Sequence, residues 1–148
     1  MNTPVRILIA DSDVEFAAEL QKSLNQYDDL NVVQWTRDGV GTVDACRETL
    51  PHVVLIDLHL PVLDTIRTIT TILTENPRLK ILALASQSED RYAVEAIKAG
   101  ASGCLDKYTQ ITAVVQAVRE VVGGDVFVNP ALASSILQEF YDISIDKS

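Results

Sequence analysis

Hydrophobic residues follow two alternating patterns along this chain. One pattern consists of short, nearly continuous apolar runs, which are typical of strands buried on both faces of a parallel sheet. Five such runs cover residues 6–10, 31–36, 53–57, 80–85 and 102–106. The run over 31–36 is more polar than the first, so it predicts a strand at the edge of the sheet.

The second pattern follows each of these runs and repeats apolar residues at helical spacing. Asp13 and Asp64 are suited to cap the first and third helices, and Gly100 is suited to end the fourth. Five strand–helix units in a row predict a doubly wound parallel sheet with helices on both faces. The apolar stripes are Phe16, Ala17, Leu20 and Leu24; Val43, Cys46 and Leu50; Ile66, Ile69 and Leu73; Ala93, Ala96 and Ile97; and Ile111, Val114, Val115, Val118, Val121 and Val122.

An additional segment follows Gly123 and Gly124, which close the last helix. Asn129 and Pro130 read as a helix cap followed by proline at the first helical position. We therefore expect one domain over residues 1–123 and a C-terminal extension over 124–148. The extension is expected to hold a short helix at about 130–141 and a loose polar tail, and one face of that helix is formed by Leu132, Ile136, Leu137 and Phe140.

Composition limits the classes of protein that fit this pattern. With 148 residues and 47% hydrophobic content, the chain can fill a single core. A net charge of -9 argues against direct binding of this chain to nucleic acid or to an anionic membrane. Cys46 and Cys104 lie in apolar patterns and are expected to be reduced core thiols. Without a membrane-spanning run or a signal-peptide profile, the expected location is cytoplasmic.

Charged residues stand at the ends of three of the apolar runs. Asp11 follows the first run, Asp57 closes the third and Lys107 follows the fifth. In an open parallel sheet, ligands gather outside the carboxyl ends of the strands. A strand-end carboxylate is common by itself, but the register of these three residues favours a site built from them.

The order and spacing of these residues resemble a response-regulator receiver domain. The resemblance rests on Asp11, on Asp57 within Val-Val-Leu-Ile-Asp-Leu-His-Leu-Pro and on Lys107, and it covers residues 5 to about 123. The stretch that ends the chain from 123 onward is similar to the NarL/FixJ-like subfamily, whose receivers precede a LuxR-type helix-turn-helix. The resemblance implies a flavodoxin-like (CheY-like) α/β fold with strand order 2-1-3-4-5 and an additional C-terminal helix.

What the resemblance implies is phosphorelay signalling in a two-component system by a protein that is not itself an enzyme. In the family, the carboxylate after the third strand accepts a phosphoryl group from a histidine of a partner kinase, so Asp57 is the candidate phosphoacceptor. Because both groups are anionic, a divalent cation must offset their charge. Mg²⁺ would take Asp11, Asp57 and the backbone carbonyl of His59 as ligands, and Lys107 would pair with the phosphate.

The same resemblance names the expected partners. These are a sensor histidine kinase or another signalling protein, and a homodimer is also open. Neither nucleic acid nor a membrane is an expected partner of this chain itself. A role in transcription regulation would therefore require a further domain or a partner.

Three positions depart from the family's pattern, and all belong to the expected mechanism. Ser12 stands where the family usually has a second metal-binding acid, so Ser12 or Asp13 is the further candidate ligand. Ala85 takes the place of a phosphate-binding hydroxyl residue, and the neighbouring Ser86 would point to the other face of the sheet. Cys104 replaces the aromatic residue whose rotation reports phosphorylation. We therefore expect a weak or absent Mg²⁺ site and an altered switch at Ala85, Ser86 and Cys104.

Two other classes of function stay open at this point. The chain could be a phosphorylation-independent pseudo-receiver that works as a protein–protein interaction module. It could also resemble a haloacid-dehalogenase-type phosphatase, in which Asp11 would be the nucleophile and Asp13 the general acid. The phosphatase hypothesis lacks the paired acids of the last motif and gives Asp57 no role.

Overall fold

Five parallel strands form a single sheet, as the sequence predicts. A computed structural model describes residues 3–86, 90–128, 133–134, 136–139 and 141–142. The strands are β1 (Val5–Ala10), β2 (Leu30–Thr36), β3 (Val53–Asp57), β4 (Lys80–Ala85) and β5 (Gly103–Asp106). The helices are α1 (Val14–Leu24), α2 (Gly39–Thr49), α3 (Thr65–Glu75), α4 (Asp90–Lys98) and α5 (Ile111–Val122). The order β2-β1-β3-β4-β5 confirms the predicted flavodoxin-like topology, with β2 at one edge.

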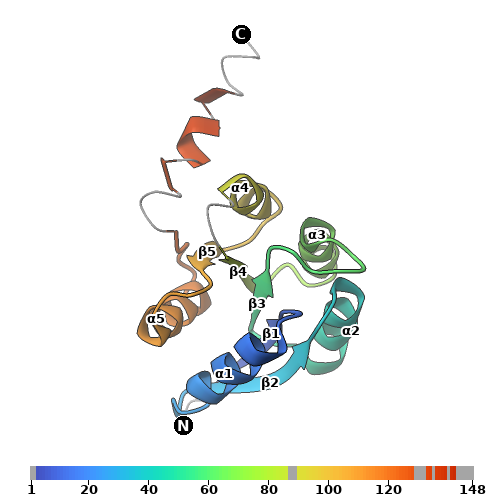
Figure 1. The fold of residues 1–148 in the computed structure, drawn as a ribbon, viewed down its shortest axis with the longest axis vertical. Helices are drawn as coiled ribbons and strands as arrows, with labels where there is room; N and C mark the ends of the chain where they lie inside the picture. Colours follow the sequence, from blue (N-terminus) through green and yellow to red (C-terminus); the bar gives the residue numbers. More distant parts are fainter. Residues whose placement is uncertain (1–2, 87–89, 129–132, 135, 140, 143–148) are drawn as a thin grey trace.

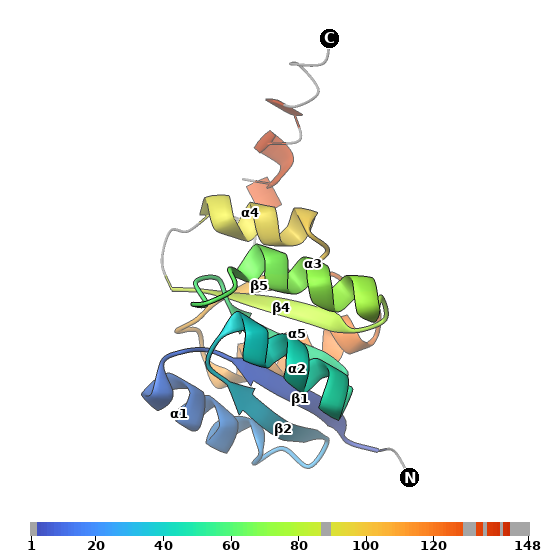
Figure 2. The same cartoon turned by 90° about the vertical axis from the view of Figure 1, so that its right-hand side faces the viewer.

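The helices cover the two faces of this sheet. Helices α1 and α5 lie on one face, and α2, α3 and α4 lie on the other (Figure 1; Figure 2 gives the view turned by 90°). Along β1, Ile7 and Ile9 pack into the α1–α5 layer, while Leu8 and Ala10 pack into the opposite layer. Every residue of β3 is buried because the sheet is covered on both sides.

Aspartate side chains begin three of the helices. Asp13 caps α1 and Asp64 caps α3, as predicted, and each accepts a backbone N–H of the first turn. Asp38 caps α2 in the same way, although the sequence did not single it out. Helix α2 ends at Thr49, and its cap Leu50 has a left-handed φ of 47° and precedes Pro51. The predicted caps Asp13 and Asp64 and the predicted end of α2 before Pro51 are therefore confirmed.

The chain after α5 turns back along β5. Phe127 forms a parallel bridge with Gly103, and its N–H donates to the Ser102 carbonyl oxygen at 3.0 Å. A Cβ atom at Gly103 would overlap the Phe127 carbonyl oxygen, so this close approach requires glycine. The bridge protects part of the β5 edge. The apolar pattern of the sequence did not predict it.

The predicted C-terminal helix falls partly outside the described residues. Residues 133–134, 136–139 and 141–142 are helical, and Glu139 Oε1 lies 2.6 Å from the ammonium of Lys98 in α4. The predicted loose tail over 143–148 lies outside the described residues, and the division of the chain at residue 123 stays a prediction.

Two expectations from composition concern the membrane and the cysteines. Of the helices in the described part of the chain, none is long and apolar enough to cross a membrane. Cys46 and Cys104 are buried and not joined in a disulfide. Burial, helped by the negative charge of Glu75, raises the pKa of the Cys46 thiol to about 12, so this thiol stays protonated at neutral pH.

Candidate functional site

Three charged side chains meet at the carboxyl edge of the sheet. Asp11 directly follows β1, Asp57 ends β3 and Lys107 directly follows β5. The Lys107 ammonium lies 2.9 Å from Asp11 Oδ2 and 4.0 Å from Asp57 Oδ2. The exposed fractions are 0% for Asp11, 8% for Asp57 and 8% for Lys107. The structure thus brings together the three residues that the sequence singled out, and Asp57 is the acid with access to solvent.

The end of the edge strand β2 fixes the backbone of Asp11. The Asp11 N–H donates to the Thr36 carbonyl oxygen at 3.0 Å, and the Asp11 carbonyl oxygen accepts the indole N–H of Trp35 at 2.8 Å. Its Oδ1 accepts the Asp13 N–H at 2.9 Å and the Lys107 ammonium at 3.1 Å. The buried carboxylate is therefore held at both its backbone and its side chain, and Lys107 compensates its charge.

The surroundings of Asp57 disfavour its negative charge. Burial, and then repulsion from the Asp11 carboxylate, raise the pKa of Asp57 above its ordinary value. The positive charge of Lys107 and a hydrogen bond from the His59 backbone act in the opposite direction without cancelling the rise. A carboxylate in this position is stabilised by any further positive charge that reaches it.

Lys107 is held as a cation between these acids and an aromatic ring. Burial favours its neutral form, but the hydrogen bond to Asp11 and the charges of Asp57 and Asp11 outweigh burial and raise the pKa of Lys107. Its ammonium also lies 4.5 Å from the centroid of the Phe16 ring of α1. Phe16 in turn meets the Tyr108 ring edge-on, with centroids 6.1 Å apart.

Thr65, the first residue of α3, ties down the loop that follows Asp57. Its buried hydroxyl donates to the Asp57 carbonyl oxygen at 2.7 Å and accepts the Leu60 N–H at 3.1 Å. One hydroxyl therefore closes the loop over residues 57–65. The role of Thr65 is not predicted by the sequence, in which the only signal is a threonine directly after the Asp64 cap.

The same loop contains a strained turn. The Leu63 N–H donates to the Pro61 carbonyl oxygen at 2.9 Å, and Val62 between them has a φ of 75°. These features define a γ-turn, a rare and strained form whose central residue here is β-branched. The Pro61 carbonyl also accepts the Gly39 N–H at 3.1 Å, and a Cβ at Gly39 would overlap the Leu63 carbonyl oxygen. The start of α2 therefore packs tightly against this turn.

Two of the remaining candidate ligands, Ser12 and His59, line a neighbouring cavity. Ser12 is exposed and lines a cavity of about 410 Å³, together with the loop after Asp57 and with Tyr92 of α4. The His59 ring packs edge-on against Tyr92, with centroids 4.8 Å apart. Asp13 lies near Asp11, but its carboxylate accepts a backbone N–H as the cap of α1.

The three expected switch positions lie at the ends of β4 and β5. Ala85 is the last residue of β4, half-buried, and its carbonyl oxygen accepts the Lys107 N–H at 2.7 Å. Ser86 follows it and is also half-buried. Cys104 is buried in β5 within the layer that contains α2, α3 and α4. The Cys104 thiol, which stands in place of the aromatic residue of the resembled family, is therefore packed in the core.

The oxygen donors at this edge fit a hard divalent cation, but they include only two carboxylates. Asp11 Oδ2 is buried and makes no hydrogen bond with a described residue, although Lys107 lies beside it as an ion-pair partner. Within the described ranges, no three His, Cys, Asp or Glu side chains are grouped as a metal site. The donor set therefore suits Mg²⁺, with less negative charge than a site with three acids would supply.

Exposed apolar side chains surround this charged edge. They come from the first turns of α1, α2 and α4 and from the loops after β3 and β5. The residues are Val14, Val40, Val62, Tyr92 and Tyr108.

Comparison with known proteins places this fold and this edge in a family. The family model described as the response regulator receiver domain matches residues 7–119. The chain therefore belongs to the response regulator receiver domain family, which confirms the resemblance seen in the sequence.

Individual relatives agree with this assignment. The response regulator GacA of Pseudomonas protegens is 28% identical over 142 residues, which are 96% of this chain and 67% of GacA. The oxygen regulatory protein NreC of Staphylococcus epidermidis is 30% identical over 141 residues, 95% of this chain and 65% of NreC. The crystal structure of a LuxR-family two-component response regulator from Aurantimonas sp. SI85-9A1 is 25% identical, with a TM-score of 0.84.

These matches also define how much of a relative this chain represents. The Aurantimonas match covers 94% of this chain and 99% of the solved one, so the folds correspond over nearly their whole length. The chain spans about two thirds of the length of GacA and NreC. The similarity to the LuxR family supports the predicted NarL/FixJ-like type of receiver.

Proposed function

We propose that Asp57 is the phosphoacceptor of this receiver and that it works with a weak Mg²⁺ site and an altered switch. The observation that carries the proposal is the position of Lys107, which is buried between Asp11 and Asp57 at the carboxyl edge of the sheet. Asp57 keeps a small exposed surface at this place, while Asp11 is shielded. A phosphoryl group that approaches from solvent therefore meets Asp57 first.

The proposed reaction is transfer of one phosphoryl group to Asp57. An Asp57 carboxylate oxygen attacks phosphorus, the bond from phosphorus to the donor nitrogen of a partner histidine breaks, and that nitrogen recovers a proton. Lys107 is 4.0 Å from Asp57, within reach of oxygens carried by the new phosphoryl group. Its ion pair with Asp11 holds the ammonium at the site before the donor arrives.

Mg²⁺ is the cation that we assign to this site, with Asp11, Asp57 and the backbone carbonyl of His59 as its protein ligands. When bound, it offsets the charge between carboxylate and phosphoryl oxygens. Asp13 serves as the cap of α1, which leaves Ser12 as the further candidate. Because the Ser12 hydroxyl carries no charge, we expect weaker Mg²⁺ binding than a third carboxylate would give.

The proposed partner is a sensor histidine kinase or another signalling protein. The five exposed apolar residues around the site provide a surface for it. DegU of Brevibacillus brevis, which is 25% identical to this chain, is named a transcriptional regulatory protein, and by analogy the output proposed here is transcription regulation. With a net charge of -9, this chain is not expected to contact DNA directly. Such an output would use a further domain or a partner, in the cytoplasm.

The phosphatase hypothesis with Asp11 as nucleophile is disfavoured by burial. Asp11 is fully buried and its two carboxylate oxygens lie 3.1 and 2.9 Å from the Lys107 ammonium. A nucleophile must reach its substrate, and Asp11 has no exposed surface from which to do so. Asp57 is the acid that has one.

A phosphorylation-independent interaction module is the second candidate function. Three features favour it: Ser12 in place of a ligand acid, Ala85 without a hydroxyl, and the buried Cys104 in place of an aromatic switch. In this case the five exposed apolar residues around the site would bind a partner protein without any chemical change at Asp57. The two candidates differ in whether Asp57 acquires a phosphoryl group.

Intact-protein mass spectrometry after incubation with acetyl phosphate and Mg²⁺ separates the two candidates. The proposal predicts one added phosphoryl group on the wild type and none on Asp57→Asn. Ser12→Asp together with Ala85→Thr should increase the labelled fraction. An unlabelled wild type, under conditions that label another receiver run in parallel, would overturn the acceptor role and favour the interaction module.

A further inference from the structure

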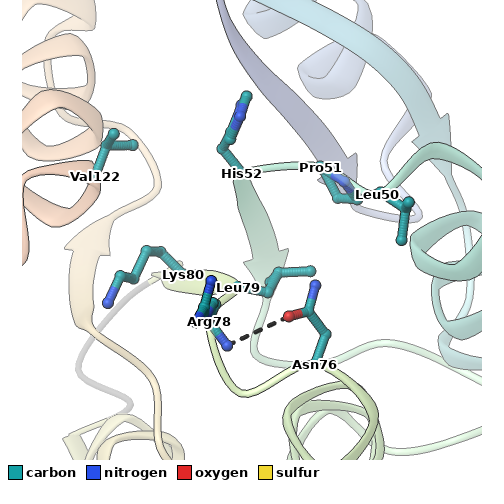
Figure 3. A pocket seen from close by; sticks show the side chains of 8 residues that line it. All are labelled: Leu50, Pro51, His52, Asn76, Arg78, Leu79, Lys80 and Val122. Atoms are coloured by element: carbon teal, nitrogen blue, oxygen red, sulfur yellow. Dashed lines mark hydrogen bonds between the residues drawn. The ribbon is translucent and has the colours of Figure 1, made fainter.

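A cavity opens at the amino edge of the sheet, opposite the candidate phosphorylation site (Figure 3). It lies between the loop from α2 to β3, the loop from α3 to β4, and the last turn of α5. Its volume is about 290 Å³, near the lower end of the usual range for small-molecule sites. The residues that line it are Leu50, Pro51, His52, Asn76, Arg78, Leu79, Lys80 and Val122.

The polar side chains of this cavity are hydrogen-bond donors, and none of its lining residues is acidic. Neither Arg78 nor Lys80 forms an ion pair with a described residue, whereas Arg47 and Arg119 each pair with surface acids. The cavity is therefore lined by two cations without acidic partners among the described residues, Arg78 in the loop before β4 and Lys80 at its first position.

The polar groups beside these cations are oriented as donors by the backbone. His52 Nδ1 accepts the Arg6 N–H at 2.8 Å, so in the neutral ring Nε2 carries the proton. Asn76 Oδ1 accepts the Arg78 N–H at 3.3 Å, drawn as the dashed line in Figure 3, which leaves the Asn76 amide NH₂ group as a donor. Imidazole, amide, guanidinium and ammonium groups thus belong to residues that line one cavity.

Apolar side chains form the rest of the lining. Pro51 and Leu79 are buried, while Leu50 and Val122 are exposed at the rim. A ligand that fits both halves of this lining carries an anionic group next to a short apolar body. We propose that the cavity binds a small organic anion, a carboxylate or a phosphate ester, through Arg78 and Lys80, with its apolar part against Leu79 and Val122.

The small volume favours such a molecule over a protein segment, because an interface with another protein needs a far larger area. The cavity is also separate from the acceptor site. His52 and Lys80 stand at or before the amino ends of β3 and β4, whereas Asp57 and Ala85 stand at their carboxyl ends. Binding at one edge can therefore be measured without phosphorylation at the other.

Nuclear magnetic resonance titrations of the ¹⁵N-labelled chain test this proposal. The probes are benzoate and phenyl phosphate, which distinguish a carboxylate from a phosphate ester, with benzyl alcohol as the neutral control and inorganic phosphate as the control without an apolar body. We expect at least one of the two anions to shift the amide signals of Leu50, His52, Asn76 and residues 78–80 in a saturable manner. Benzyl alcohol and inorganic phosphate should bind at least several-fold more weakly.

Matched variants locate the binding. Arg78→Gln with Lys80→Gln removes both cations, and the dissociation constant should rise by roughly tenfold or more. Arg67→Gln removes an exposed arginine from α3, away from the cavity, and should leave the constant unchanged. Raising the salt concentration should weaken binding to the wild type.

Three results would overturn the proposal. One is a shift pattern spread over lysines and arginines of the whole surface without saturation. Another is an equal loss of affinity in Arg67→Gln and in the double variant. The third is binding of an Asp-rich peptide to this edge while neither small anion binds, because that result would assign the cavity to a protein partner.

Discussion

The two edges of the sheet differ in the burial of their charged side chains, although the same five strands form both edges. At the carboxyl edge, Asp11, Asp57 and Lys107 are almost completely buried and neutralise one another in part. At the amino edge, charges remain in solvent, as in the exposed ion pair of Arg119 with Asp29 at 2.9 Å.

Because the charges of the carboxyl edge are buried, they lower the free energy of unfolding unless each is paired with an opposite charge. The solvent-exposed charges of the amino edge contribute little to the free energy of unfolding, because water screens them. The difference predicts that substitutions of charged or buried polar residues change the free energy of unfolding more at the carboxyl edge than at the amino edge, and matched substitutions at the two edges can test this.

The largest expected difference is between two lysines. Lys107→Met should lower the free energy of unfolding at neutral pH by about 3 kcal/mol, because it leaves Asp11 buried without its cation. Lys80→Met, at the amino edge, should change it by less than about 0.5 kcal/mol. Urea titrations followed by circular dichroism measure both values. Equal losses for the two lysines would contradict the contrast between the edges.

The next difference is between two threonines. Thr65→Val should cost about 2 kcal/mol, because the Leu60 N–H and the Asp57 carbonyl oxygen lose their partner. Thr49→Val, near the amino edge, should cost less than about 0.5 kcal/mol, since its hydroxyl only donates to a carbonyl of its own helix. Thr65→Ser keeps the hydroxyl and should recover much of the loss. A Thr65→Val variant as stable as the wild type would show that the Thr65 hydroxyl does not stabilise the loop after Asp57.

Two residues with positive φ provide a smaller contrast. Val62→Gly should raise the free energy of unfolding by about 1 kcal/mol, because it relieves a β-branched residue at φ 75°. Leu50→Gly, at the amino edge, should raise it by about 0.5 kcal/mol, since φ 47° at a helix end is less strained. Thermal unfolding of both variants shows which substitution stabilises the protein more. A destabilised Val62→Gly variant would show that the γ-turn is not strained.

The smallest effects concern pH, and they have opposite signs at the two edges. The pKa of Asp57 is raised, so stability from this group is present below the ordinary carboxyl pKa and is lost as pH rises through the raised value. Asp57→Asn should therefore stabilise the protein at neutral pH, and the gain should disappear on acidification.

Asp29 provides the control. A hydrogen bond from Arg119 lowers the pKa of Asp29, so its contribution is present above the ordinary value and is lost as pH falls through the lowered one. Asp29→Asn should slightly destabilise the protein at neutral pH and lose its effect in acid. Unfolding curves at several pH values give both slopes. A gain on Asp57→Asn that persists in acid would show that charge is not its cause.

The sequence predicted the carboxyl edge better than the contacts that support it. Continuous apolar runs fix where strands end, and parallel strands bring their carboxyl ends together. The meeting of Asp11, Asp57 and Lys107 follows from this alone. The bond from Trp35 to Asp11 does not, because the β1–β2 pairing shifts register between Ile7 and Leu8, and this shift places the end of β2 beside Asp11.

Other features depend on contacts between segments far apart in the chain. The role of Thr65 depends on the path of the loop after Asp57, which hydrophobic periodicity does not describe. The amino-edge cavity joins His52, Asn76 and Val122, each of which looks like an ordinary loop or helix residue in the sequence. Apolar patterns predict layers and strand ends, whereas side-chain hydrogen bonds and cavities need the folded chain.

The decisive measurement is the Mg²⁺ dependence of acetyl phosphate labelling at Asp57, compared between the wild type and Ser12→Asp. Both proteins are expected to gain one phosphoryl group on Asp57. Ser12→Asp is expected to reach half-maximal rate at a roughly tenfold lower Mg²⁺ concentration, because the added carboxylate strengthens the site. An unlabelled wild type at every Mg²⁺ concentration would contradict the acceptor role. Identical midpoints in the two proteins would contradict the weakened metal site.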